Sequence, residues 1–161
     1  MSHDVEPLET GIWLGQLRKL AARRARNEAE LGASLRRGFH LAVLTPRPLR
    51  DVVACTLPES EFELLLESKA LLPATLALLG NGLNYALSHL NRAGRIEAEV
   101  WFSNECGGGV ARAPTAAAAL FAAWLNCLLT LDRTASEAAK LPSPPVRRRC
   151  LSERRPRLTE H

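Results

Sequence analysis

The sequence predicts an α+β fold in which helices pack on one face of a small, mostly antiparallel sheet. Apolar residues make up 47% of the 161 residues, enough for a single hydrophobic core. Helical and strand-like periodicities occur in separate segments, as is typical of this class. The expected order of elements is α-β-β-α-α-β-β-α. One domain is expected over residues 1–141, followed by a flexible basic C-terminal tail over residues 142–161.

The first element is expected to be one long helix over residues 7–37. Pro7 suits a first-turn position, and Gly38 follows two arginines as a stop signal. Arg24 and Asn27 interrupt the apolar stripe, so the middle of this helix is expected to face water or a partner.

Two strands are expected next, FHLAVLT at 39–45 and RDVVACTL at 50–57. Both runs are rich in strand-forming residues, and a proline-containing loop separates them. For the second run, a short helix starting at Pro48 is the alternative, because proline is favoured at the first helical position.

The central part of the chain predicts two more helices. One begins at Pro58 and ends near residue 71. The second is expected over residues 72–90, because its apolar stripe advances by threes and fours across Gly80-Asn81-Gly82 without losing phase. We therefore expect one continuous helix in spite of the two glycines.

The clearest strand is RIEAEVWFS at 95–103, in which apolar and polar residues alternate. NECGGG at 104–109 is expected to be a turn, VARA at 110–113 a short return strand, and Pro114 the start of the last helix. Residues 113–131 carry no charge. Because this run is mostly alanine, a buried helix is favoured over a membrane span.

The formal excess of positive charge lies in the tail. The chain has a net charge of +4, and residues 141–161 hold six arginines and two glutamates. Guanidinium groups can neutralise phosphates or bind carboxylates bidentately, so nucleic acid and an acidic protein surface both fit, while a solvated end that aids solubility is the simple alternative. The basic candidates are Arg147, Arg148, Arg149, Arg154, Arg155 and Arg157 in the tail, and Arg18, Lys19, Arg23, Arg24 and Arg26 in the body.

The glycine-rich loop at 104–112 suggests two other sites. Cys106 could act as a nucleophile if His40 or His89 supplied the base. Alternatively, an anion could bind to the backbone of Gly107, Gly108 and Gly109, with Arg112 as the counter-charge. A hairpin turn with an incidental thiol explains the same residues more simply.

The cysteines do not predict a metal site or a disulfide scaffold. Cys55, Cys106, Cys127 and Cys150 are widely separated, so they lack the local spacing of zinc ligands. Reduced thiols and an acidic start without an apolar segment predict a cytoplasmic protein. No cofactor is expected.

These features together predict a non-enzymatic binding or adaptor protein, a subunit of a larger assembly or a homodimer, with no membrane attachment. Its expected partner is nucleic acid or an acidic protein surface, contacted through the arginine-rich tail. The alternative is a small cysteine-dependent enzyme or anion-binding protein that uses the 104–112 loop.

Overall fold

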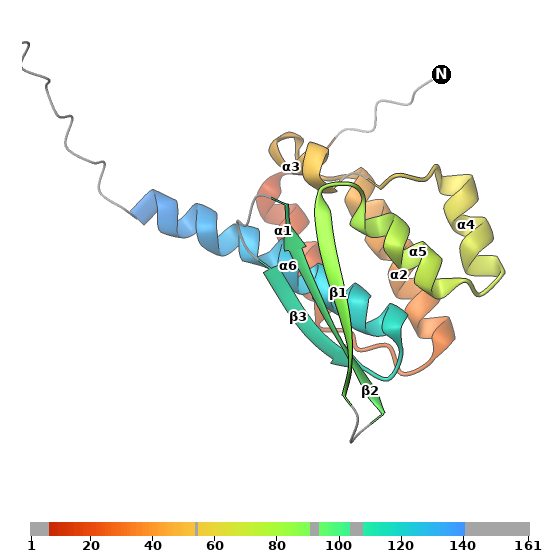
Figure 1. Ribbon diagram of the computed structural model, residues 1–161. Coiled ribbons are helices and arrows are strands. Elements are labelled where there is room, and N and C mark those ends of the chain that lie inside the picture. Colours follow the sequence, from red (N-terminus) through yellow and green to blue (C-terminus); the bar gives the residue numbers. More distant parts are fainter. Residues whose placement is uncertain (1–6, 54, 91–93, 104–107, 141–161) are drawn as a thin grey trace, which may run out of the picture.

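The computed structural model describes residues 7–53, 55–90, 94–103 and 108–140, and within them five helices precede a three-stranded sheet and a sixth helix follows it (Figure 1). The helices are α1 (Thr10–Ala21), α2 (Glu28–Val43), α3 (Arg47–Val53), α4 (Glu59–Glu67), α5 (Leu71–Leu79) and α6 (Ala116–Lys140), and the strands are β1 (Leu83–Leu90), β2 (Arg95–Phe102) and β3 (Gly108–Ala113). This confirms the α+β class. The order α-α-α-α-α-β-β-β-α differs from the expected one.

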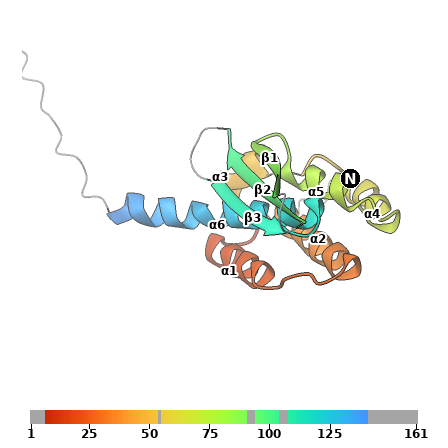
Figure 2. The same ribbon diagram turned by 60° about the horizontal axis from the view of Figure 1, so that its bottom comes forward.

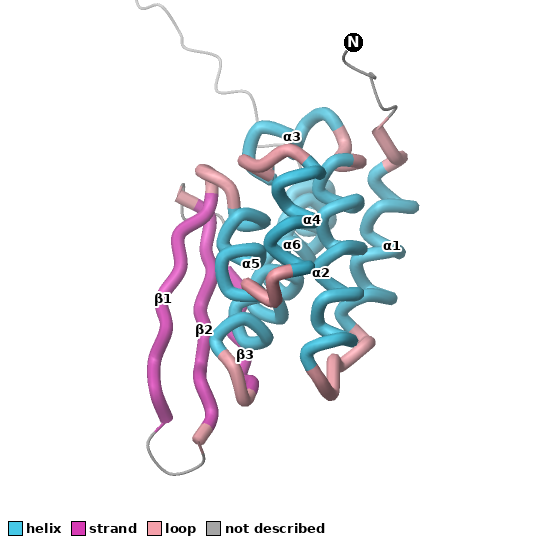
Figure 3. Tube along the Cα trace, turned by 90° about the vertical axis from the view of Figure 1, so that its right-hand side faces the viewer, coloured by secondary structure: helices cyan, strands magenta, loops and turns pink. Residues whose placement is uncertain are grey.

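The molecule is built in layers around α6. The strands are antiparallel in the order β1-β2-β3, and the helices lie on one face of the sheet, as predicted (Figure 3). α6 packs directly against β2 and β3, and α1 and α5 contact its other side. In Figure 2, α6 lies between the sheet and the pair α1 and α2. The central helix is therefore covered on both sides, while its last turns project beyond the body (Figure 1).

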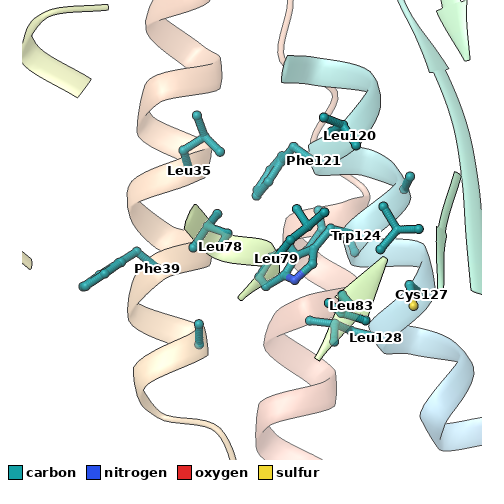
Figure 4. Packing of buried hydrophobic residues seen from close by; sticks show 14 of the residues in the cluster. Leu35, Phe39, Leu78, Leu79, Leu83, Leu120, Phe121, Trp124, Cys127 and Leu128 are labelled. Atoms are coloured by element: carbon teal, nitrogen blue, oxygen red, sulfur yellow. The ribbon is translucent and has the colours of Figure 1, made fainter. Parts of the chain in front are cut away.

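The core forms where α6 meets the other helices. Phe121 and Trp124 of α6 stack with their ring centroids 5.8 Å apart, and both point from α6 toward α2 and α5 (Figure 4). Gly38 of α2 lies against these rings, since a Cβ atom there would be 2.9 Å from Phe121 Cε2. Across α1 and α2, Trp13 Nε1 donates a hydrogen bond to the Leu41 carbonyl oxygen (2.8 Å).

The prediction of one helix over residues 7–37 is wrong, because the chain forms two helices with a connection over residues 22–27. Asn27 is the cap of α2, and its side-chain oxygen accepts a hydrogen bond from the Glu30 N–H (2.8 Å). The Glu30 carboxylate in turn accepts one from the Arg26 N–H (2.8 Å). This arrangement is a variant of the capping box, in which the glutamate side chain accepts from the N–H of the residue before the cap and not from that of the cap itself. Asn27 thus begins a new helix, and Gly38 lies inside that helix.

The predicted strands at 39–45 and 50–57 are also wrong. Residues 39–43 continue α2, because Phe39 and Ala42 extend the buried stripe of Leu31 and Leu35 with helical spacing. Over Arg47–Val53 the chain forms α3, which agrees with the alternative of a short helix near Pro48.

The continuous helix predicted over residues 72–90 is wrong because the glycines do end it. α5 stops at Leu79, and Gly80 follows with φ 61° and ψ −161°, a conformation that only glycine adopts readily. β1 begins at Leu83 and pairs with β2 along its whole length. Leu83 and Ala86, which continued the helical stripe beyond Gly80, therefore lie on opposite faces of a strand, because successive strand side chains alternate between the two faces.

The last three elements follow the prediction closely. In β2, Ala98, Val100 and Phe102 form the buried face, as the alternation indicated. The return strand is present as β3, but it includes Gly108 and Gly109, which were assigned to the turn. The uncharged segment forms the buried part of α6, and Thr115 Oγ1 accepts a hydrogen bond from the Ala118 N–H (3.3 Å) at its start.

Candidate functional site

A cavity of about 640 Å³ lies beside the edge strand β3. The connection between α1 and α2 forms one wall, and α6 forms another. Its apolar lining includes Ala111 and Ala113 of β3 and Phe121 and Leu125 of α6. This volume lies within the range of sites that hold small molecules or a few side chains of a partner, roughly 300–1,000 Å³.

Arginines from three separate segments line the same cavity. Arg23 and Arg24 come from the connection after α1, Arg95 from the start of β2, and Arg112 from β3. All four side chains are exposed. By strand alternation, Arg95 and Arg112 lie on the face of the sheet that is directed away from α6, so they contribute to the rim of the cavity and not to its floor. The structure thus brings Arg23 and Arg24 of the predicted basic segment to the same place as Arg112, and it adds Arg95, which the sequence analysis did not single out.

Glu97 is the acidic residue among the lining groups, and it is paired. Glu97 and Arg112 are opposite one another in the register of β2 and β3, and the Arg112 guanidinium donates a hydrogen bond to the Glu97 carboxylate. Four arginines and one glutamate give the lining a formal excess of three positive charges. Such a surface attracts anionic groups, most strongly at low ionic strength.

The helix start at Asn27 explains how two arginines reach the cavity. α1 ends at Ala21 and α2 begins at Glu28, so Arg23 and Arg24 lie on a connection and not on the helix that the sequence analysis expected. Arg18 and Lys19 are on α1 and, like Arg26, they are exposed, but they do not line this cavity. The sequence feature that could have predicted this helix start is Asn27 followed by a glutamate three residues later.

The floor of the cavity depends on a very close approach of α6 to β3. A Cβ atom on Gly109 would overlap the Ala123 carbonyl oxygen and the Cys127 amide nitrogen of α6. Beside it, Asn126 Nδ2 donates a hydrogen bond to the Val110 carbonyl oxygen (3.0 Å). Gly109 is therefore covered by helix backbone, and this close packing accounts for a glycine at that position.

The residues of the cysteine-dependent alternative are only partly described. Cys106 and Gly107 lie outside the described residues. His40 is exposed on α2, His89 is exposed on β1, and Gly108 is exposed at the start of β3. The structure therefore places the two histidines on different elements, and no distance from either to Cys106 follows from it.

The cysteines that are described lie in surroundings that disfavour a thiolate. Burial raises the pKa of Cys127 to about 12, although the Gly109 backbone acts in the opposite direction. Burial also raises the pKa of Cys55, which is half-buried, and the Cys55 thiol donates to the Ala77 carbonyl oxygen (3.2 Å). A nucleophilic cysteine needs a lowered pKa, so these two thiols are ordinary packing groups.

Within the described part of the chain, no cluster of three or more His, Cys, Asp or Glu side chains could hold a metal ion. In the same residues, no helix is long and apolar enough to cross a membrane. The six tail arginines, from Arg147 to Arg157, and Cys150 lie outside the described residues.

Comparisons with protein-family models, curated proteins and solved structures gave no match. The function of the cavity is therefore inferred from its geometry and charge.

Proposed function

We propose that this chain is a non-enzymatic binding protein that holds an acidic segment of a partner protein in the arginine-lined cavity. The single observation that carries this proposal is the combination of an apolar floor with Arg23, Arg24, Arg95 and Arg112 around it. Aliphatic side chains of the partner would occupy the floor, and neighbouring carboxylates would contact the guanidinium groups, which can bind them bidentately.

An acidic protein segment fits this cavity better than nucleic acid does. Bases of single strands are held mainly by stacking on aromatic rings. Phe121, the aromatic residue of the lining, is only 5% exposed and stacks on Trp124 within the core. The arginines would still attract phosphates, so nucleic acid binding would be mostly electrostatic and weakly specific.

The arginine-rich tail would supply a second contact to the same partner. It follows α6, whose end at Lys140 is fourteen residues beyond Asn126 of the cavity lining. At about 1.5 Å per residue this corresponds to roughly 20 Å along the helix axis. Cavity and tail would therefore contact different parts of one acidic partner, and together they would bind more tightly than either alone.

The test measures fluorescence anisotropy of a labelled peptide that alternates glutamate with leucine, and of a single-stranded RNA of equal length. We expect the Arg23→Ala/Arg24→Ala variant to bind the peptide roughly tenfold more weakly, because each exposed ion pair contributes about 1 kcal/mol or less. The matched control is Arg37→Ala/Arg47→Ala, which removes the same charge from exposed positions on α2 and α3 that do not line the cavity.

Three results would contradict the proposal. Equal weakening by both double variants would mean that only net charge matters. Binding of RNA that is tighter than binding of peptide would assign the cavity to nucleic acid. Peptide binding that the Arg23→Ala/Arg24→Ala variant leaves unchanged would remove the cavity from the interaction altogether.

A further inference from the structure

The sheet has two edges, β1 and β3, and their backbone directions can be derived from the pairing. The Ser103 N–H donates to the Gly82 carbonyl oxygen (3.2 Å). Gly82 and Ser103 are therefore a hydrogen-bonded pair, next to the pair of Leu83 and Phe102. In antiparallel strands such pairs alternate with non-hydrogen-bonded ones. The N–H and C=O groups of Leu83, Tyr85, Leu87 and His89 therefore point away from β2, toward the open side of the sheet.

The edge at β3 is protected. By the same alternation, the backbone groups of Val110 and Arg112 point outward, and the Val110 carbonyl oxygen already accepts a hydrogen bond from the Asn126 side chain (3.0 Å). Arg112 adds a charge to this edge. Edge strands in soluble proteins are commonly protected by charged residues or by coverage from another element. β3 is protected in both ways, by the charge of Arg112 and by the Asn126 side chain of α6.

Among the described residues, the edge at β1 has neither kind of protection. LNYALSHL, residues 83–90, contains no Lys, Arg, Asp, Glu or Pro, and its register with β2 is continuous over eight pairs, without a bulge. Such a strand presents a row of backbone donors and acceptors that a further strand can use.

The helix-facing side of β1 is also left uncovered. Tyr85 and Leu87 are opposite Val100 and Ala98 of β2, so they are on the same face of the sheet. Val100 and Ala98 are 0% exposed, whereas Tyr85 is 46% and Leu87 is 41% exposed. The reason is that α6 packs on β2 and β3, and β1 extends beyond it (Figure 3).

We propose that β1 pairs antiparallel with β1 of a second copy of this chain, which joins two three-stranded sheets into one of six strands. A two-fold axis at Ala86 places Tyr85 opposite Leu87 of the second copy, and Leu87 opposite its Tyr85. Both residues have outward backbone groups, so each such pair is a hydrogen-bonded one. A two-fold interface pairs this strand with an identical strand, so any charge on it would come close to the same charge on the second copy. Because LNYALSHL carries no formal charge, the pairing meets no like-charge repulsion.

This dimer leaves the proposed binding cavity open. The cavity lies beside β3, on the opposite edge of the sheet from β1. The two cavities of the dimer would therefore lie at the two ends of the six-stranded sheet. The dimer does not depend on the proposed function, but it would make the protein bivalent for an acidic partner.

The experiment measures the molar mass of the full chain by size-exclusion chromatography with light scattering at micromolar concentrations. We expect twice the chain mass of 17.6 kDa for the wild type and the single mass for Leu87→Lys. Each lysine would lie opposite Tyr85 of the second copy and diagonally across the axis from the other lysine, where the two charges repel and cannot be buried. The matched control is Leu64→Lys, which makes the same change at a residue of α4 that is 63% exposed. This control should remain a dimer.

A second measurement tests the register and does not depend on the stability of Leu87→Lys. In the Ala86→Cys variant the two new cysteines face each other across the axis, where Cα atoms of a non-hydrogen-bonded pair are about 4.5 Å apart, close enough for a disulfide. Mild oxidation should give a disulfide-linked dimer that mass spectrometry maps to residue 86. A monomeric wild type, a dimer that persists in Leu87→Lys, or oxidised Ala86→Cys without this linkage would overturn the proposal.

Discussion

Gly109 is the position at which one added methyl group should disturb the fold most. In Gly109→Ala, the new Cβ would overlap the backbone carbonyl oxygen of Ala123 and the backbone amide nitrogen of Cys127, and it would be 2.8 Å from the Asn126 carbonyl carbon. All three atoms belong to the backbone of α6, which lies in the middle of the molecule. The overlap cannot be relieved by rotating a side chain, so β3 and α6 must move apart.

The cost of this substitution can be estimated from its surroundings. Overfilling a well-packed core commonly destabilises a protein by about 1–3 kcal/mol. Because the obstacle here is backbone, we expect about 3 kcal/mol. For a chain of this length, each kcal/mol lowers the melting temperature by roughly 2–4 °C, so the expected decrease is roughly 6–12 °C.

Thermal unfolding followed by circular dichroism measures this decrease directly. The control is Gly15→Ala in α1, where a Cβ atom would meet nothing within 4 Å, and where alanine should stabilise the helix by up to about 1 kcal/mol. If Gly109→Ala melts at the wild-type temperature, α6 does not lie against β3 as closely as the structure has it, and the floor of the cavity would need a different explanation.

Three further predictions concern the cap, a surface ion pair and a buried thiol. Asn27→Ala should lower the free energy of unfolding by about 1 kcal/mol in urea titrations, because the cap of α2 is lost; an unchanged midpoint would mean that the cap contributes nothing. The Arg36 guanidinium lowers the pKa of Glu63 through a bidentate hydrogen bond. Because the pair is exposed, Glu63→Gln should lower the free energy of unfolding by less than about 1 kcal/mol. That contribution is present above the unfolded-state pKa of about 4.3 and is lost as the pH falls through the lower folded value, so a difference in melting temperature that persists below that value would contradict the assignment. Cys127, with its pKa raised to about 12, should react with a thiol reagent at pH 8 only after denaturant is added, as mapped by mass spectrometry, and rapid labelling of the folded protein would show that its burial is incomplete.

Some of the fold could be predicted from the sequence because local signals were sufficient. Alternation of apolar and polar residues identified β2, since period-two patterns belong to strands with one buried face. The long uncharged run identified α6 as a buried helix, which its fully buried Leu120 and Trp124 confirm. The glycine-rich stretch before it was correctly assigned to a hairpin region, although two of its glycines are part of β3.

Other assignments failed where a local signal had two physical meanings. Asn27 was taken as a polar interruption of one helix, whereas its side chain begins a second one. Residues 39–43 have strand-forming composition, yet packing of Phe39 against Phe62, with ring centroids 4.5 Å apart, accompanies their helical form. Tertiary contacts override such weak local preferences.

By itself, the sequence determined the fold class, the position of the central helix and the presence of a basic segment near residues 18–26, because composition and periodicity act locally. Only the tertiary structure decided that Arg23 and Arg24 share a cavity with Arg95 and Arg112, which are about seventy to ninety residues away along the chain. It also decided that Gly109 is a contact site for α6 and that β1 is the unprotected edge. These properties depend on which elements become neighbours, and that is settled by packing around α6, which no short stretch of sequence encodes.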